Sequence, residues 1–292
     1  YRDHSDRSGL RLTDFAEPKN SWEKRLRNKL IEVIDKLRSL YPEFNPDQFL
    51  KQFPFEKLEE IRLQLRMAVI DLPEFLNDAR TLGQGILVEA AQGTMLDIRH
   101  GTYPFVTSSH PVVQGCLEGT GLSHREVTNV FGVMKAYTTR VGEGPFPSRM
   151  DPETEKLVRE LGQERGTTTG RNRNCGWLDF VKLRYACRLN GVSGLIVTKF
   201  DFFHRLPSLR ICAAYQNGER SVAYLPANME GIEGVFEEVE KWDQPVSSAG
   251  TWQKLPAACK RYLERISAAL GTPISALSLG PERSSAIEIN QI

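Results

Sequence analysis

A glycine-flanked segment of the chain combines hydroxyl groups with two guanidinium groups. Residues 166–173 have the sequence Gly-Thr-Thr-Thr-Gly-Arg-Asn-Arg, in which the arginines are Arg171 and Arg173. Arginine presents a planar fork of N–H donors that matches a carboxylate or a phosphate in bidentate fashion. The glycines let the backbone approach a ligand and let the loop move. We therefore predict an anion-binding loop, with a solvated basic turn as the alternative.

A second candidate site follows a short apolar run at residues 194–197. The next residues are Thr198-Lys199-Phe200-Asp201. A carboxylate there can accept from both N1–H and N2–H₂ of guanine, two donors that adenine does not present together, while the lysine stem lies along the purine face. Such a site would select GTP over ATP, because hydrogen-bonding groups would be left unpaired when adenine occupied it. The alternative is that the lysine and the aspartate form a salt bridge at the end of the strand, which the same four residues would also fit.

A third candidate is the polar segment 92–109, which is dense in Gly, Thr and Ser. The amide of Gln92 and the hydroxyl of Thr107 are neutral groups that can bind a base edge or a phosphate. His100 has no defined catalytic partner, so a structural role fits it better, and no histidine has metal-ligand spacing. Neither G-x-x-x-x-G-K-[ST] nor G-x-G-x-x-G occurs in the chain.

Hydrophobic periodicity predicts the elements that must position these segments. Apolar residues at steps of three and four predict helices over 22–37 and 58–79, the second ending at Gly83, and further helices over 180–189 and 255–270. Short apolar runs at 86–88, 194–197 and 274–279 predict buried strands that end in polar loops. Runs at 209–215 and 220–225 flank Asn217-Gly218, which predicts a hairpin. The order predicts an α/β fold with a largely parallel central sheet flanked by helices and an antiparallel hairpin excursion.

Composition limits the class of protein. The chain has 292 residues, with 38 Lys and Arg against 37 Asp and Glu, a net charge of +1 that argues against nucleic-acid or anionic-membrane binding. Five cysteines without a C-x-x-C pair argue against a disulfide scaffold or a zinc knuckle, and no run has the length of a signal sequence or membrane span. We expect a cytoplasmic protein. Because residue 1 is Tyr and the first residues are polar, we expect the chain to start partway through a longer one.

Four long segments together resemble the adenylosuccinate synthetase family. They are Glu89–Ser109, Lys135–Pro147, Gly166–Asp179 and Thr198–Asp201, in the family's order with near-family spacing. The opening Tyr1–Arg11 resembles the segment that follows the family's N-terminal ligand loops. The resemblance implies a P-loop-NTPase-like architecture and a single synthetase domain over residues 1–292, incomplete at its N-terminus, with a mainly helical subregion at 12–83.

The resemblance also implies a reaction. The family couples GTP, IMP and L-aspartate to GDP, phosphate and adenylosuccinate with Mg²⁺, the first committed step of AMP synthesis from IMP. The γ-phosphoryl of GTP goes to O6 of IMP, and the aspartate amine then displaces it at C6. The family's general base, general acid, Mg²⁺ ligands and phosphate loop lie upstream of the position that matches Tyr1. We therefore expect no catalytic residue and no metal ligand in this chain, and no activity from it alone.

The remaining site residues are also implied by the resemblance. The expected IMP contacts are Arg7, Gln92, Thr107, Val141, Gly142 and Arg171, with Arg7 acting across a homodimer interface on the partner's IMP. The expected aspartate-binding residues are Thr167, Thr168, Thr169, Gly170, Arg171, Asn172 and Arg173. The expected GTP contacts are Arg173, Lys199, Phe200, Asp201, Ser278, Leu279 and Gly280.

Four positions depart from the family's usual pattern, namely Ala90, His110, Asn172 and Asn174. The two asparagines reduce positive charge near the anion loop, so weaker aspartate or nucleotide binding is one expectation. Two other functions remain open at this point. One is a non-catalytic relative that binds nucleotide or regulates a full-length copy, and the other is a relative that acts on a modified purine monophosphate.

Overall fold

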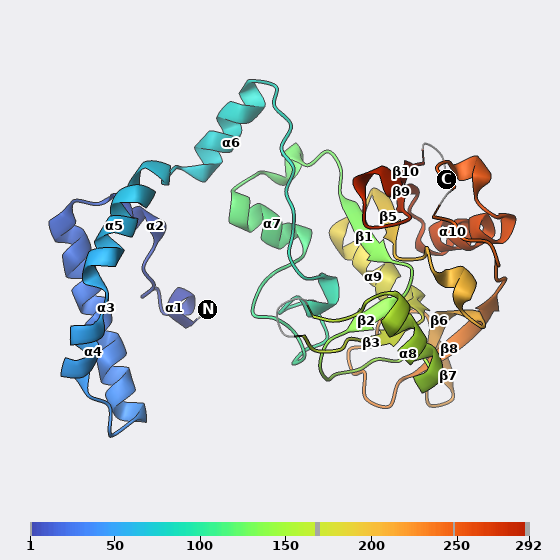
Figure 1. The fold of residues 1–292 in the computed structure, drawn as a ribbon, viewed down its shortest axis with the longest axis horizontal. Coiled ribbons are helices and arrows are strands. Elements are labelled where there is room, and N and C mark those ends of the chain that lie inside the picture. The colour runs from blue at the N-terminus through green and yellow to red at the C-terminus, as the bar shows by residue number, and fades with distance from the viewer. Residues whose placement is uncertain (1, 167–169, 248, 290–292) are drawn as a thin grey trace. The chain divides into compact units, whose positions relative to one another are not determined.

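The chain divides into two compact units, Tyr1–Ile86 and Leu87–Ile292 (Figure 1). A computed structural model describes residues 2–166, 170–247 and 249–289. Each unit is described by itself below. The assignment of residues 1–292 to one domain stays a prediction.

The first unit is helical, as predicted for the region 12–83. Its elements are α1 (Arg2–Ser5), α2 (Leu12–Ala16), α3 (Lys19–Leu40), α4 (Pro46–Gln52), α5 (Phe55–Leu65), the 3₁₀ turn η1 (Arg66–Ala68) and α6 (Leu72–Thr81). The stripe that predicted α3 is buried, with Trp22, Leu26 and Leu30 packed against side chains from α2, α4 and α5. This apolar seam holds the unit together.

The prediction of one continuous helix over 58–79 was wrong. Helix α5 ends at Leu65, and α6 begins after Asp71, whose side chain accepts from the Glu74 amide at 3.3 Å. Pro73 has no N–H to donate and is tolerated only in the first turn of a helix, so a new helix starts there. The predicted stop at Gly83 is confirmed, because its φ of +74° is the left-handed conformation that glycine favours.

The second unit contains a largely parallel sheet in the order β1-β5-β9-β10. Strands β1 (Phe131–Lys135), β5 (Gly194–Thr198) and β9 (Ile274–Ser278) are parallel, and β10 (Ala286–Glu288) is antiparallel to β9. Helices α9 (Phe180–Asn190) and α10 (Ala257–Leu270) accompany the sheet, which confirms the predicted fold class. The strands predicted at 194–197 and 274–279 and both helices are confirmed.

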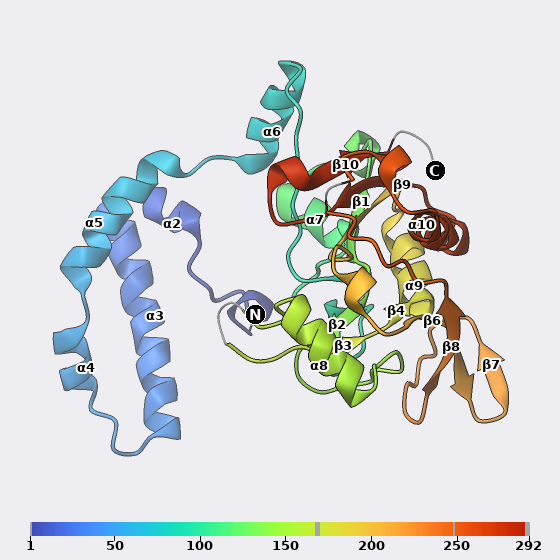
Figure 2. The ribbon, with the colours of Figure 1, turned by 45° about the vertical axis from the view of Figure 1, so that its right-hand side comes forward.

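A second sheet carries the predicted hairpin. It joins β4 (Leu178–Asp179), β6 (Leu209–Asn217), β7 (Arg220–Val222) and β8 (Glu233–Val239), which Figure 2 shows beside one another. Gly218 has a φ of +60° in the turn between β6 and β7, and β7 is shorter than the predicted run. A small antiparallel pair, β2 (Thr138–Arg140) with β3 (Asn174–Gly176), lies outside both sheets, as do α7 (Val113–Thr120) and α8 (Pro152–Leu161).

The strand predicted at residues 86–88 is absent from the described structure. These residues have no strand assignment, and Leu87 is 91% exposed. A strand is defined by backbone pairing with a neighbour, which three apolar residues cannot supply by themselves. The interpretation as a buried strand was therefore wrong for the described residues.

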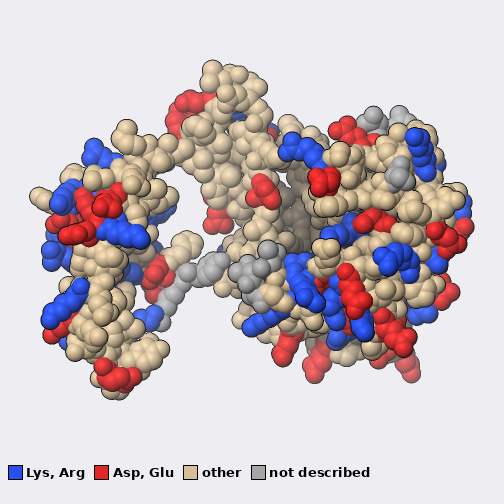
Figure 3. All heavy atoms as spheres, in the orientation of Figure 1, with Lys and Arg blue, Asp and Glu red and all other residues tan. Residues whose placement is uncertain are grey.

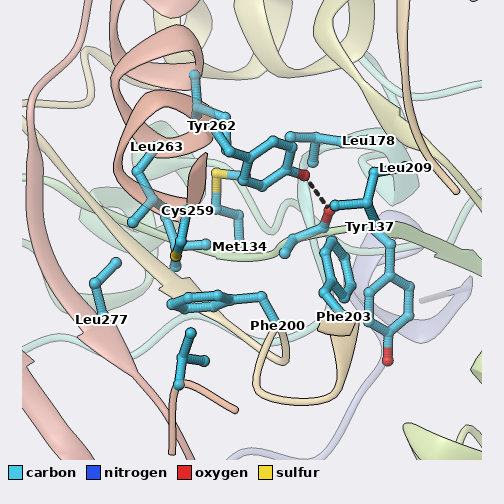
Figure 4. Packing of buried hydrophobic residues seen from close by; sticks show 14 of the residues in the cluster. Met134, Tyr137, Leu178, Phe200, Phe203, Leu209, Cys259, Tyr262, Leu263 and Leu277 are labelled. Carbon is cyan, nitrogen blue, oxygen red and sulfur yellow. Dashed lines mark hydrogen bonds between the residues drawn. The ribbon is translucent and has the colours of Figure 1, made fainter. Parts of the chain in front are cut away.

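The core of the second unit lies between α10 and the parallel sheet (Figure 4). Phe200 and Leu263 are fully buried there, and the Tyr262 hydroxyl donates to the Ala136 carbonyl at 2.9 Å. Phe203 packs edge-on against Tyr262 with ring centroids 6.1 Å apart. These contacts anchor both the end of β1 and the turn that follows β5.

On the face seen in Figure 3, acidic and basic side chains are interspersed over both units. This agrees with the near-zero net charge of the sequence. Among the described helices, none is both long enough and apolar enough to cross a membrane.

Candidate functional site

Gln92 and Thr107 are joined by hydrogen bonds through one serine. The Ser109 hydroxyl donates to Gln92 Oε1 at 3.3 Å and shares a hydrogen bond of 2.6 Å with the Thr107 hydroxyl. Gln92 has a left-handed backbone with φ 55°, an unusual conformation for a residue with a side chain. The segment 92–109 therefore folds back so that its predicted ligand-binding amide and hydroxyl lie together.

A buried carboxylate organises this segment from within. Asp97 Oδ1 accepts from the backbone amides of Arg99 and His100 at 2.8 and 2.9 Å, and Oδ2 lies 3.4 Å from His110 Nδ1. Burial disfavours the charged form, but the two amides and the nearby histidines outweigh it and hold the pKa of Asp97 below its ordinary value. Asp97 thus braces the loop as an anion.

Arg140 connects the predicted nucleotide-contacting turn to the same segment. Its guanidinium donates to the Thr102 hydroxyl at 3.2 Å, to the Phe105 carbonyl at 3.3 Å and to the Glu143 carbonyl at 2.8 Å. Val141 and Gly142, which follow it directly, are exposed, and Gly142 has a φ of +76°. Sequence reasoning assigned Arg140 no role, because two of its three partners, Thr102 and Phe105, lie more than thirty positions away.

The described part of the predicted anion loop closes on itself. The Gly166 amide donates to the Arg171 carbonyl, and the Gly170 amide donates to the Gly166 carbonyl, both at 2.8 Å. Gly170, Arg171 and Asn172 are exposed, and Gly170 has a φ of +64°. Three residues predicted to bind aspartate lie outside the described residues, namely Thr167, Thr168 and Thr169.

Arg173 faces inward from this loop toward a buried carboxylate. Its Nη1 donates to Glu164 Oε2 at 2.8 Å, and Glu164 Oε1 accepts from Lys135 Nζ at 2.7 Å and from the Tyr137 hydroxyl at 2.6 Å. Glu164 is 1% exposed. Sequence reasoning missed Glu164. The available signal was an acidic residue directly before a loop rich in glycine, threonine and arginine.

The predicted guanine-binding turn begins at the end of β5. Lys199 has a left-handed backbone with φ 62°, its Nζ donates to the Gly162 carbonyl at 3.0 Å, and Asp201 is partly exposed. Phe200 is fully buried, so a ligand could reach only its backbone.

The predicted GTP contacts after β9 lie beside this turn in the sheet. Thr198 and Ser278 are register partners on parallel strands, so residues after each strand emerge at the same edge. The Ser278 hydroxyl donates to the Gly280 carbonyl at 2.9 Å, and the Leu279 amide donates to the Ser285 carbonyl at 3.0 Å. Leu279 itself is 2% exposed, so it too offers its backbone.

Arg7 lies in the first unit, where it is exposed and has a left-handed backbone with φ 56°. Its predicted action in a partner subunit stays a prediction. Within residues 2–166, 170–247 and 249–289, no group of three or more His, Cys, Asp or Glu side chains could hold a metal ion.

Comparison with known proteins gives one family. The model for the adenylosuccinate synthetase family matches residues 1–287. The adenylosuccinate synthetase of Heliobacterium modesticaldum is 38% identical over all of this chain and 68% of its own length, and that of Caldanaerobacter subterraneus is 40% identical over 98% of this chain and 67% of its own length. A structure described as fully ligated adenylosuccinate synthetase from Plasmodium falciparum has a TM-score of 0.88 and 32% identity, covering 99% of this chain and 68% of that one.

Proposed function

This chain belongs to the adenylosuccinate synthetase family, and on that premise we propose that it serves the GTP-dependent ligation of L-aspartate to IMP, giving adenylosuccinate, GDP and phosphate. The observation that carries the proposal is the pairing of an arginine loop with the turn of Lys199 and Asp201. Gly162 contacts Lys199 and Glu164 contacts Arg173, and both residues belong to the same short connection after α8. An anion-binding group and a guanine-binding group on one support are what this reaction requires.

The described residues act by binding and orienting the three substrates. Gln92, Thr107 and Arg171 contact IMP, with the backbone of Val141 and Gly142 beside it. The loop 167–173 holds the aspartate carboxylates, while Arg173, Lys199, Asp201 and the 278–280 turn hold GTP. In this scheme the γ-phosphoryl passes to O6 of IMP, and the aspartate amine then displaces phosphate at C6. Catalysis of this kind depends on positioning and on stabilising phosphoryl charge.

We propose that the phosphate loop, the general base, the general acid and the Mg²⁺ ligands are supplied from outside these 292 residues. The absence of a phosphate-loop motif from the sequence supports this. We therefore assign Mg²⁺ no ligand in this chain and derive no step through it.

The test is formation of adenylosuccinate from IMP, GTP, L-aspartate and Mg²⁺. We expect turnover by the protein as its gene encodes it and none by the isolated 292-residue chain. Turnover by the isolated chain would overturn the assignment of the missing groups. Calorimetric binding of guanine nucleotide by the gene product without turnover would instead favour a non-catalytic regulatory relative, and turnover only with an altered purine monophosphate would favour the narrower specificity.

We also propose a cytoplasmic homodimer in which Arg7 acts in trans on the partner's IMP. Mixing an Arg7→Leu variant with an Arg171→Leu variant would then form hybrid dimers that contain one intact site. Partial recovery of activity on mixing is the expected result. Complete absence of recovery, with dimers detected by sedimentation, would contradict action in trans.

A further inference from the structure

One buried carboxylate connects the segments that carry the proposed aspartate and GTP contacts. Glu164 accepts three hydrogen bonds from three parts of the chain: Lys135 at the end of β1, Tyr137 just after it, and Arg173 in the anion loop. All three are 2.6–2.8 Å long. A carboxylate that is 1% exposed and fixed by three donors has little freedom to reorient.

The proposed guanine-binding turn after β5 packs against Tyr137, one of the three partners of Glu164. The Tyr137 ring lies 5.8 Å from Phe202 and 6.2 Å from Phe203, which directly follow the proposed guanine contact Asp201. In addition, Lys199 Nζ bonds the Gly162 carbonyl two residues before Glu164. Displacement of Glu164 would therefore disturb both the anion loop and the guanine turn.

The charge of Glu164 is matched by its surroundings. Burial disfavours its ionised form, but hydrogen bonds from Lys135, Tyr137 and Arg173 more than compensate and keep the pKa of Glu164 below its ordinary value. The carboxylate is thus an anion at neutral pH, and it fixes the Nη1 group of the Arg173 guanidinium.

We propose that Glu164 is a positioning residue, which orients Arg173 toward the ligands of the anion loop and keeps that loop in register with the guanine turn. The proposal rests on the proposed function above. It predicts that Glu164 governs the binding of aspartate and GTP, which share Arg173. It also predicts that IMP binding is affected little by Glu164, because most of the proposed IMP contacts lie outside the anion loop, with Arg171 as the exception.

Glu155 supplies a matched control. It is also a nearly buried glutamate, 4% exposed, and it accepts from Arg149, Arg159 and the Cys175 amide at 3.1, 2.6 and 3.2 Å. Its side-chain donors include no proposed substrate contact, although Arg159 Nε also donates to the backbone carbonyl of Arg173 at 3.0 Å. Glu164→Gln and Glu155→Gln therefore remove similar buried charges, but only the first releases the side chain of Arg173.

The experiment measures KM for each substrate in the protein as its gene encodes it. We expect Glu164→Gln to raise KM for aspartate and GTP about tenfold, the equivalent of one lost charge-assisted hydrogen bond, with KM for IMP within about twofold of wild type. Glu155→Gln should change all three by less than about twofold, and Glu164→Asp, which keeps the charge, should recover part of the loss. Equal changes in both glutamine variants, or unchanged aspartate and GTP constants in Glu164→Gln, would overturn the proposal.

A second measurement separates this proposal from the proposed function. Hydrogen–deuterium exchange without substrates should be faster than wild type in peptides covering Gly170–Asn174 and Thr198–Phe203 in Glu164→Gln. Because Arg159, a partner of Glu155, also bonds the Arg173 carbonyl, the discriminating peptide is Thr198–Phe203, which should exchange as in wild type in Glu155→Gln. Faster exchange in Glu164→Gln, together with no ligase turnover by the wild-type protein, would contradict the proposed function but support the positioning role of Glu164. If a folded Glu164→Gln protein exchanged both peptides at the wild-type rate, the positioning role would be contradicted and the proposed function would be unaffected.

Discussion

The ammonium nitrogen of Lys199 donates to the carbonyl oxygen of Gly162 at 3.0 Å, and so joins two loops that are 37 residues apart in the sequence. The bond anchors the turn after β5 to the end of α8. Lys199 reaches it from a left-handed backbone conformation, which costs energy for a residue with a Cβ atom. The neighbouring Asp201 is thereby held on a fixed and partly exposed turn, where its carboxylate is available to a ligand.

The first prediction concerns that carboxylate. Asp201→Asn replaces an acceptor by an amide whose NH₂ donors face the N–H donors of guanine, so GTP binding should weaken by about 1–3 kcal/mol. Isothermal titration of GTP against both proteins measures the difference. The exposed Asp243, paired with Lys241 at 3.0 Å, offers Asp243→Asn as a charge-matched control. Identical GTP affinity in Asp201→Asn and wild type would remove the guanine assignment.

The second prediction concerns the exposed arginine of the anion loop. Arg171→Leu should lower kcat by about a hundredfold or more, because it removes the guanidinium that we propose binds the anionic groups of the substrates. The closure of the loop should survive, because the Gly166 amide bonds the Arg171 backbone carbonyl, which any residue supplies. Kinetics and thermal unfolding are measured together.

Arg188→Leu is the control for that substitution. Arg188 is exposed near the end of α9, and its Nε donates to the Arg184 carbonyl of the same helix. Its replacement should leave kcat unchanged. Near-normal turnover by Arg171→Leu would show that the anion loop was misinterpreted.

The elements that were predicted correctly are those with a pattern of their own. Helix α3 has an apolar stripe, and β5 and β9 are short, mainly apolar segments followed by polar loops. The run 86–88 is too short to carry such a pattern, and whether it pairs depends on its neighbours. Strand β8 was missed because Glu233–Val239 mixes charged and apolar residues, and only its pairing with β6 makes it a strand.

The site shows the same division between local and distant information. Gln92, Thr107, Arg171 and Asp201 could be proposed because their segments are unusual in composition. Glu164 and Arg140 were not proposed, because the contact of Glu164 with Tyr137 and that of Arg140 with Thr102 span 27 and 38 positions. Contacts at that separation depend on the packing of the sheet and are invisible in a linear pattern.

The third prediction concerns acid stability. Since the folded pKa of Asp97 lies below its ordinary value, its ionisation stabilises the fold above the unfolded pKa of about 3.9, and this contribution is lost as pH falls through the lower folded pKa. Asp97→Asn keeps an oxygen acceptor for the Arg99 and His100 amides but cannot ionise. The free energy of unfolding, measured with denaturant from pH 6 to pH 2 to bracket that titration, should therefore fall less steeply with decreasing pH in the variant than in the wild type. Parallel pH profiles would contradict the role of the Asp97 anion.

The fourth prediction concerns the five thiols. Burial raises the pKa of Cys175, Cys212 and Cys259 to about 12, so their thiolate fraction near pH 8 is on the order of 10⁻⁴, and reagents reach them poorly. Cys187 is also buried, whereas Cys116 is partly exposed. A disulfide-exchange reagent should therefore modify one thiol rapidly in the native protein and all five in denaturant. Cys116→Ser should abolish the rapid phase without slowing the others; a rapid phase that survives this substitution would mean that one of the four buried cysteines becomes accessible through local opening of the fold.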